Sequence, residues 1–319
     1  MRVKTTVPCL ILHALLIMAV CLGVVLPLTA RAAENGMGVY ALGYNSSMAG
    51  FLPPPGAYLR NDFYAYQGTA TKIPLSGRIE ASLRGRYLID MVNFTYVTPN
   101  KILGANYAAY VIWVPISNVF IKGKVEFANI ISREREGDLT SVGDLVIAPI
   151  VLGWHQGNWH IISLFNVYAP VGSYSTTRVL NTGLNRWAVE PMVLVTWLHP
   201  KIGTEFSMAL GYTVNFKNYA TQYTTGNEMH LEWFAGQHFS KWLAAGLAGY
   251  FYQQVTGDTG AGARLGAFQG QTLAIGPCIS LNGTIAKHAI GLNIRYYNEL
   301  TVTNRLSGQS FWGTLTFGF

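Results

Sequence analysis

The stretch GQSFWGTLTFGF, residues 308–319, ends the chain and decides how the rest of the sequence is interpreted. Between residues 310 and 319 the odd positions are Phe, Gly, Leu, Phe and Phe, and the even positions are Ser, Trp, Thr, Thr and Gly. This period of two is typical of a β-strand with one apolar face. The last residues of a soluble domain usually fray, so an apolar strand that ends on Phe319 needs a further reason. A membrane barrel provides it, because its last strand must pair with its first to leave no edge in lipid.

The composition agrees with a membrane protein that has no membrane helices. Charged residues make up 12% of the 319 residues and hydrophobic residues 50%, whereas soluble domains average about 25% charged residues. Beyond the N-terminus, no apolar run approaches the ~20 residues that a membrane helix needs. Apolar residues at every second position explain both observations. A soluble lipocalin-like barrel or β-sandwich, with its apolar face inside, is the alternative.

Residues 1–32 have the features of a secretory signal peptide. Arg2 and Lys4 precede an apolar run over residues 7–28, and small residues at positions 30 and 32 fit the spacing that signal peptidase recognises. We expect this segment to be cleaved, and a retained membrane anchor is the alternative.

The mature chain would keep one cysteine and a small positive charge. Of three cysteines, only Cys278 lies beyond the signal, so the mature chain can form no internal disulfide. Removal of Arg2, Lys4 and Arg31 leaves 19 basic residues (22 minus 3) against 15 acidic ones. An excess of this size does not indicate nucleic-acid binding.

The remaining chain is expected to comprise an N-terminal segment and a barrel. Residues 33–76 are rich in Pro and Gly, and the prolines at 53–55 cannot donate ladder hydrogen bonds. We expect this segment to lie at the mouth or in the lumen, with an extra strand at 58–68 as the alternative. Residues 77–319 alternate apolar and polar positions, with predicted turns at 98–100 and 115–118 and a charged loop at 133–138.

Short and long connections alternate along most of the barrel, as in outer-membrane barrels with short periplasmic turns and long extracellular loops. The predicted fold class is therefore all-β. We expect an antiparallel transmembrane β-barrel of roughly 12 strands, with 14 as the alternative.

The facing of the strands predicts which side chains line a pore. In residues 203–216, Phe206 and Tyr212 share the face expected to meet lipid, and Glu205 and Ser207 share the face expected to meet water. The same assignment on the other strands gives a set of lumen or pore candidates. They are Arg84, Arg86, Lys122, Lys124, Glu126, Glu205, Glu228, His230, Glu232, Tyr250, Tyr252 and Arg295.

No catalytic residue, metal site or cofactor is predicted. His230 and Glu232 share a strand face with Glu228 and His238 and could imitate metal ligands, but their spacing identifies no complete ligand set. The sequence contains no Gly-x-Ser-x-Gly nucleophile elbow, and the glycine-rich stretch 257–262 does not open a helix. We therefore predict a protein that is not an enzyme, and keep an outer-membrane hydrolase as an alternative.

Several short motifs occur together in the mature chain. They include Gly143-Asp144-Leu145, Leu152-Gly153-Trp154-His155, Gly157-Asn158-Trp159-His160, Val167-Tyr168-Ala169-Pro170, Glu190-Pro191 and Tyr252-Gln253-Gln254-Val255-Thr256-Gly257-Asp258. As a set they resemble the family of outer-membrane channels associated with meta-pathway phenol degradation. The resemblance implies a β-barrel channel or transporter, often linked with uptake of aromatic or other hydrophobic compounds. It implies no binding residues.

The expected function is an outer-membrane channel or transporter for small molecules, with aromatic or other hydrophobic compounds as the class that the resemblance implies. A non-conducting structural or binding barrel is the alternative. The expected location is the bacterial outer membrane, after secretion through the inner membrane. Expected partners are outer-membrane lipid, an unspecified small-molecule substrate and the barrel assembly machinery, because terminal Phe319 resembles the signal that this machinery reads. No nucleic-acid partner is expected.

Overall fold

The computed structural model describes residues 38–75, 79–127, 131–178, 180–263, 266–267 and 269–319. The chain divides into two units, Met1–Ala30 and Arg31–Phe319, and every described residue belongs to the second. The expected signal peptide, residues 1–32, lies outside the described residues. Within them, no helix is long and apolar enough to cross a membrane.

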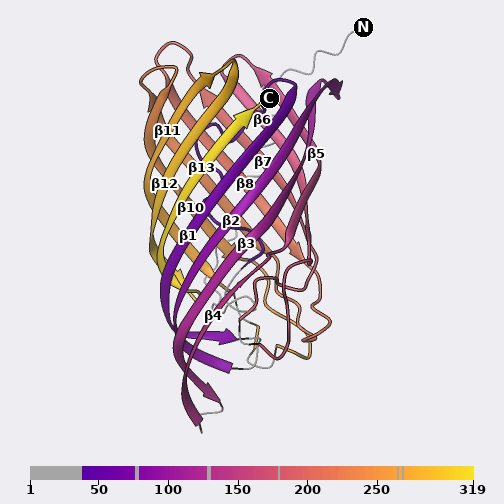
Figure 1. Ribbon diagram of the computed structural model, residues 1–319, viewed down its shortest axis with the longest axis vertical. Coiled ribbons are helices and arrows are strands. Elements are labelled where there is room, and N and C mark those ends of the chain that lie inside the picture. The colour runs from indigo at the N-terminus through magenta and orange to yellow at the C-terminus, as the bar shows by residue number, and fades with distance from the viewer. Residues whose placement is uncertain (1–37, 76–78, 128–130, 179, 264–265, 268) are drawn as a thin grey trace. The chain divides into compact units, whose positions relative to one another are not determined.

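Twelve antiparallel strands close into a barrel, as predicted (Figure 1). Strand β1 pairs with β2 on one side and β13 on the other, and β3 pairs with β2 and β5, so the ring returns to its start without β4. In the described residues β4 pairs with β3 only, beyond the ring. The strands are β1 (Gly56–Leu75), β2 (Ile79–Ile102), β3 (Ala105–Phe127), β4 (Ile131–Ser141), β5 (Leu145–Gln156), β6 (Trp159–Ala169), β7 (Ala188–Leu198), β8 (Thr204–Asn215), β9 (Glu228–His238), β10 (Leu243–Gln254), β11 (Gln271–Ile285), β12 (His288–Thr303) and β13 (Ser307–Gly318).

The last strand closes the barrel against the first. The register of β1 and β13 runs from Tyr58 opposite Gly318 to Thr69 opposite Ser307. The backbone N–H of Phe319 donates to the carbonyl of Ala57 at 2.9 Å, so the final residue belongs to the seam. The barrel therefore begins at Gly56 and not at residue 77, and the alternative strand at 58–68 lies within β1.

Strands β2 and β3 are longer than the sequence pattern indicated. They contain 24 and 23 residues and pass through both predicted turns, at 98–100 and 115–118. The actual turn lies at Leu103 and Gly104, which have φ of 51° and 76°. Pro115 sits in a β-bulge, because Asp90 faces Ile116 while Val92 faces Trp113. The predicted loop at 133–138 is also wrong, since these residues are part of β4.

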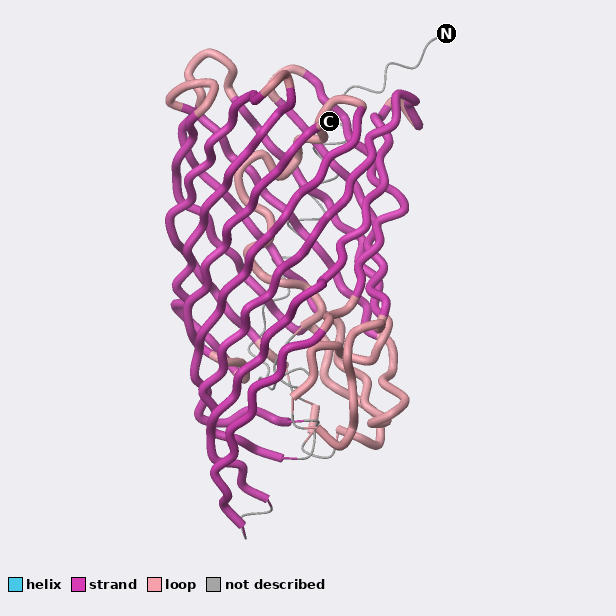
Figure 2. The backbone as a smooth tube through the Cα atoms, in the orientation of Figure 1, coloured by secondary structure: helices cyan, strands magenta, loops and turns pink. Residues whose placement is uncertain are grey.

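The two ends of the barrel differ in their connections. At the upper end in Figure 1 the turns are short, for example between β5 and β6 and between β11 and β12. At the lower end lie the connections 170–187, 216–227 and 255–270, together with the extensions of β1 to β4 (Figure 2). Outer-membrane barrels have short turns at the periplasmic end, so the lower end is extracellular.

The side chains of β8 show the facing expected of a membrane barrel. Phe206 and Tyr212 are exposed on the outside, whereas Glu205, Ser207 and Thr213 are buried inside. A soluble barrel would have the opposite arrangement, so the lipocalin-like alternative is excluded.

Candidate functional site

A segment without regular secondary structure, residues 38–55, lies inside the barrel, and we call it the lumen segment. Figure 2 shows it as a loop-coloured trace between the front and back strands. Leu42 and Leu52 are buried, and the segment contacts the wall near Glu228 at Gly38 and near Thr196 at Gly50. It therefore follows the lumen from the extracellular side towards the periplasmic end, where β1 begins.

The carboxylate of Glu232 on β9 binds the middle of the lumen segment. It accepts hydrogen bonds from the backbone N–H groups of Gly43 at 2.6 Å and Asn45 at 2.9 Å. The hydroxyl of Tyr40 donates to the same carboxylate at 2.7 Å. Glu232 is 1% exposed, and hydrogen bonds to an ionised acceptor are about twice as strong as neutral ones. The wall therefore holds this part of the segment through its backbone.

Glu205 on β8 binds the next part of the segment in the same way. Its carboxylate accepts the N–H of Met48 at 2.5 Å and the hydroxyl of Ser47 at 2.8 Å. From the wall it accepts Ser207 Oγ at 2.6 Å and contacts His238 Nε2 at 2.6 Å. A buried carboxylate with this many donors is stabilised in its charged form.

Gly50 passes so close to the wall that no other residue fits. Its N–H donates to Thr196 Oγ1 at 2.9 Å. A Cβ atom there would lie 2.4 Å from the carbonyl oxygen of His160 and 2.5 Å from the backbone nitrogen of Thr196. Both atoms belong to the backbone of paired strands, so they cannot shift without disturbing the hydrogen bonds of the barrel.

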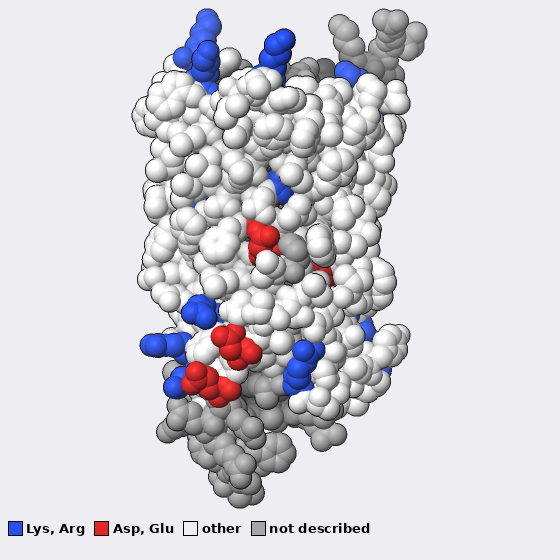
Figure 3. Space-filling view, viewed as in Figure 1, with Lys and Arg blue, Asp and Glu red and all other residues white. Residues whose placement is uncertain are grey.

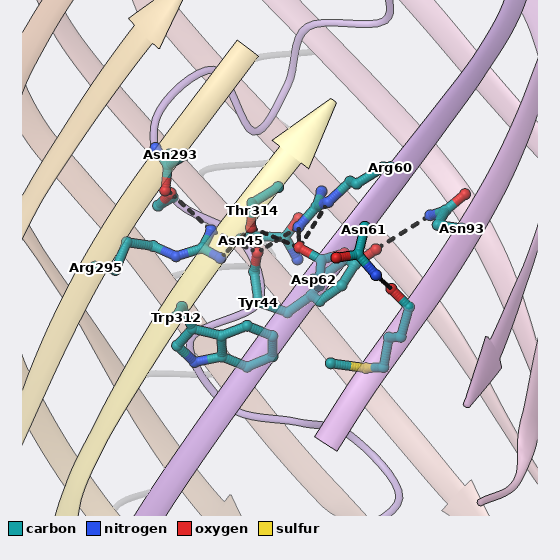
Figure 4. A network of polar contacts seen from close by, with 12 residues as sticks. Tyr44, Asn45, Arg60, Asn61, Asp62, Asn93, Asn293, Arg295, Trp312 and Thr314 are labelled. Carbon is teal, nitrogen blue, oxygen red and sulfur yellow. Dashed lines mark hydrogen bonds and ion pairs between the residues drawn. The ribbon is translucent and has the colours of Figure 1, made fainter. Parts of the chain in front are cut away.

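The opposite wall holds the lumen segment through its carbonyl groups (Figure 4). Arg295 donates to the carbonyl of Tyr44 at 3.0 Å and to Thr314 Oγ1 at 2.8 Å. Thr314 in turn donates to Asp62 at 2.6 Å, and Asp62 forms an ion pair with Arg60 at 2.8 Å. Arg60 completes the network by donating to the carbonyl of Tyr44 at 3.2 Å.

Trp312 on β13 contacts both the lumen segment and Arg295 of the same network. Its indole N–H donates to the carbonyl of Leu42 at 3.2 Å, and the ring lies 5.2 Å below the guanidinium of Arg295. The side chain is fully buried. The indole therefore packs on the segment and satisfies one of its backbone carbonyls at the same time.

Another buried carboxylate, Glu190 on β7, lies beside the segment. It contacts His230 Nε2 at 2.9 Å and accepts the hydroxyls of Tyr168 at 2.6 Å and Thr213 at 2.7 Å. The ring of His230 stacks on Tyr40 with centroids 3.7 Å apart. Tyr40 thus contacts both carboxylate sites, because its hydroxyl donates to Glu232 and its ring stacks on His230, the partner of Glu190.

A cavity of about 880 Å³ lies beside the lumen segment. This volume is in the ~300–1,000 Å³ range of small-molecule sites. On β2, β3 and β5 to β7 its wall is mainly apolar. The aliphatic residues and methionines there are Ile89, Met91, Ile112, Val114, Val146, Val151, Ile162, Leu164, Met192 and Leu194, and the polar ones are Asn93, Thr95, Ser117 and Asn166. On β11 to β13 its wall is polar and includes Ser280, Asn282, Asn293, Thr314 and Thr316. The cavity therefore has one mainly apolar side and one mainly polar side.

The structure places seven of the predicted lumen residues inside the barrel. They are all buried: Glu205, Glu228, His230, Glu232, Tyr250, Tyr252 and Arg295. Glu228 accepts the hydroxyl of Tyr252 at 3.0 Å, and Tyr250 donates to Glu299 at 3.1 Å. Among the described residues no three His, Cys, Asp or Glu side chains form a group that could hold a metal ion.

The predicted facing is wrong for Arg84, Arg86 and Lys122, which are exposed on the outer face. Their neighbours Leu83 and Tyr87 point inwards and pack with Leu180 and Leu306. The inner face of this part of β2 and β3 packs on connections between strands, so its apolar side chains point inwards and its charged side chains point outwards. The side chains of Lys124 and Glu126 lie outside the described residues.

Sequence reasoning missed two parts of the site. The apolar wall was not predicted, because a membrane barrel leads one to expect a polar lumen. Glu190 and Asp62 were also missed. Both alternate with outward-facing residues in their strands, so the period of two could have assigned them to the lumen.

Two carboxylates hold the connections at the extracellular end in place. Asp144 accepts the backbone N–H groups of Gly172 and Leu184, both at 2.8 Å, and burial raises its pKa. Asp258 accepts the hydroxyl of Tyr223, the N–H of Gly226 at 2.9 Å and Gln254 Nε2 at 2.6 Å.

Burial raises the pKa of Asp258 to about 6. The hydrogen bonds from Tyr223, Gly226 and Gln254 oppose this rise but do not cancel it. Asp258 therefore changes charge within the pH range that outer-membrane proteins meet.

Comparisons with solved structures agree with this architecture. The COG4313 outer membrane channel from Pseudomonas putida F1 is similar over 84% of this chain and 97% of its own, with a TM-score of 0.61 and 13% identity. The β domain of the Bordetella autotransporter BrkA covers 83% of this chain and 99% of its own, with a TM-score of 0.45 and 8% identity. The first likeness shows a shared fold. No curated protein sequence matches the chain.

The family comparison covers most of the chain. Residues 62–315, from β1 to β13, match the family described as "Putative MetA-pathway of phenol degradation". The match confirms the resemblance drawn from the motifs, and with the barrel and its outer-membrane neighbour it identifies an outer-membrane β-barrel. The chain belongs to this phenol-degradation family.

Proposed function

We propose that this protein is an outer-membrane channel for small, largely apolar molecules, and that the lumen segment constricts its path. The observation that supports the substrate class best is the apolar wall of the 880 Å³ cavity. A channel for hydrophilic solutes does not need aliphatic residues in its interior, because apolar surface in contact with water costs free energy. An apolar molecule leaving water gains from the same surface.

The tyrosines of the cavity supply the polar groups that such a site needs for orientation. Tyr64, Tyr66, Tyr87, Tyr110 and Tyr168 line it together with the aliphatic residues. Aromatic side chains pack on planar ligands. The hydroxyls of Tyr110 and Tyr168 donate to Asn166 and Glu190, so their oxygens can accept a hydrogen bond from a polar substituent of the ligand. This combination favours small aromatic compounds within the apolar class, and the family's association with phenol degradation supports the same class.

The contacts of the lumen segment support constriction rather than permanent closure. Glu232, Glu205 and Arg295 bind its backbone, and such polar contacts can exchange for water when the segment moves. Displacement of the segment would join the apolar cavity to the polar side of the lumen. We propose this as the event that opens the channel.

The buried pair of His230 and Glu190 does not require an enzymatic reaction as its explanation. A base and an orienting carboxylate are two parts of a hydrolytic triad, but one face of the His230 ring is covered by Tyr40 at 3.7 Å. Glu190 also accepts Tyr168 and Thr213, which fits a structural anchor. We therefore propose no enzymatic activity.

Uptake into liposomes tests the proposal. Purified protein in liposomes should speed the entry of a small aromatic compound over protein-free liposomes, and should speed the entry of a sugar of similar size much less. Equal and negligible entry of both solutes would favour the alternative, a non-conducting structural barrel. A faster entry of the sugar would contradict the substrate class.

A further inference from the structure

The outer face of the barrel carries an arginine pair at the extracellular limit of its apolar band. Arg84 and Arg86 on β2 are exposed, while Leu83 and Tyr87 beside them point inwards. Figure 3 shows that charged side chains of this face gather at its lower end and at its upper rim, with only a few isolated charged groups between them. The pair therefore belongs to neither the lumen nor the lipid-covered wall.

The register between β1 and β2 shows how far the arginine pair lies from the periplasmic end of the barrel. Arg86 lies opposite Gln67, eleven residues beyond Gly56 at the periplasmic end. A strand that rises ~3.3 Å per residue with a tilt of ~45° covers about 25 Å over this length, which is the height of the apolar band of such barrels. On the periplasmic side of this level the outer face carries exposed Phe63, Phe94 and Trp113. The guanidinium groups are thus at the level of the outer-leaflet headgroups.

The nearest described carboxylates on this face lie one strand beyond the residues opposite the pair, because Glu136 and Asp138 on β4 face Lys122 and Phe120 on β3. Arg84 lies directly opposite Lys122, and like charges in this position are unfavourable by themselves. Lys122 forms an ion pair with Glu136 at 3.0 Å on its other side. Arg86 lies over the ring of Phe120 at 5.4 Å. In the described part of the chain, neither arginine is joined to a carboxylate.

We propose that Arg84 and Arg86 bind a phosphate group of the outer-leaflet glycolipid, lipopolysaccharide. Residues two apart on a strand are ~6.6 Å apart, so both guanidinium groups can reach one phosphate. Arginine binds phosphate through two parallel N–H groups, and Phe120 holds Arg86 against the wall in position to do so. A phosphate between Arg84 and Lys122 also relieves the repulsion between them. The proposal rests on the outer-membrane location and orientation but not on what the channel transports.

Native mass spectrometry of the purified full-length mature barrel tests the proposal. The probes are diphosphoryl lipid A, the same lipid without its phosphates, and inorganic phosphate. The test variant is Arg84→Gln with Arg86→Gln. The matched control is Lys201→Gln with Lys241→Gln, which removes two exposed positive charges from the periplasmic rim. The heat-dependent shift in gel mobility confirms that each variant is a folded barrel.

We expect the wild type and the control to bind diphosphoryl lipid A alike, and the arginine variant to bind it at least roughly tenfold more weakly, because both guanidinium groups that hold the phosphate are lost. Lipid without phosphates should bind the wild type and the arginine variant equally. Equal binding of diphosphoryl lipid A to the wild type and the arginine variant would overturn the proposal. Displacement of the lipid by millimolar inorganic phosphate would also overturn it, because the site would then recognise a free anion.

Discussion

Glu232, in the middle of β9, accepts the backbone N–H of Gly43 at 2.6 Å across a sequence separation of 189 residues. The contact joins the barrel wall to a segment that precedes the first strand. Gly43 has a φ of 89°, and a Cβ atom there would lie 2.6 Å from the ring of Tyr297, so both backbone and space require glycine. This relationship makes the lumen segment part of the folded barrel.

The first prediction concerns the charge of Glu232. Glu232→Gln keeps the shape of the side chain but removes the charge that strengthens its bonds to Gly43, Asn45 and Tyr40. We expect a loss of about 1–3 kcal/mol in the free energy of holding the segment. Hydrogen exchange of residues 38–55 measures it, and exchange should rise in the variant. The control is Glu136→Gln, an exposed glutamate outside the lumen, and equal exchange in both variants would refute the anchoring role.

The second prediction concerns the closest approach of segment and wall. Gly50→Ala places a methyl group 2.4 Å from the carbonyl oxygen of His160, so either the segment or the wall must shift. Overpacking of this kind costs about 1–3 kcal/mol. We expect a lower temperature for the heat-dependent gel shift. Gly313→Ala is the matched control, because its added Cβ meets nothing nearer than 3.6 Å, and an equal effect of both substitutions would argue against a tight fit at Gly50.

The third prediction concerns pH. Burial raises the pKa of Asp258 to about 6, above its ordinary value of 3.8, so the folded connection binds a proton more tightly than the unfolded one. Its stability therefore falls as the pH rises from about 4 through 6 and then levels off. We expect the connections 216–227 and 255–270 to exchange hydrogen faster at pH 7.5 than at pH 5, after correction for the intrinsic rate. Asp258→Asn should remove this difference, whereas Asp138→Asn should leave it in place.

The fourth prediction concerns the apolar wall. Leu164→Asn replaces an aliphatic side chain on the apolar side of the cavity with a smaller amide that has a similar branched shape. We expect slower entry of a small aromatic solute into liposomes, because the solute gains less on leaving water. Val193→Asn, on the exposed outer face of the next strand, is the control for a general effect on the barrel. Faster or unchanged aromatic entry with Leu164→Asn would count against an apolar path.

The barrel itself was predictable because facing and closure follow from local patterns. The alternation at residues 310–319 and the apolar end at Phe319 predicted a last strand that pairs with the first, and the register confirms this pairing, although the first strand is β1 and not one that begins at residue 77. The strand boundaries were harder to predict. Pro115 has the sequence signature of a turn, but a bulge lets the strand continue past it. Gly56 follows three prolines, so the start of β1 was not evident from local propensity.

The side chains of Arg84 and Arg86 show what the alternation cannot determine. A period of two separates two faces but does not say which face is inside, and the answer reverses where a strand leaves the membrane. The lumen segment was predictable only as an irregular segment near the barrel. Its anchors, Glu205 and Glu232, lie more than 150 residues away along the chain, and no local pattern pairs them with it.

The most direct test of the central claim is the conductance of single channels in planar bilayers, with and without residues 38–52. This deletion leaves β1 intact, since the strand begins at Gly56. We predict a low conductance for the full-length mature protein and a several-fold higher, steadier conductance for the deletion variant, with aromatic solute entering its liposomes faster. Folding of both proteins is checked by the heat-dependent gel shift. Equal conductance of two folded proteins would contradict the claim that the lumen segment constricts the channel.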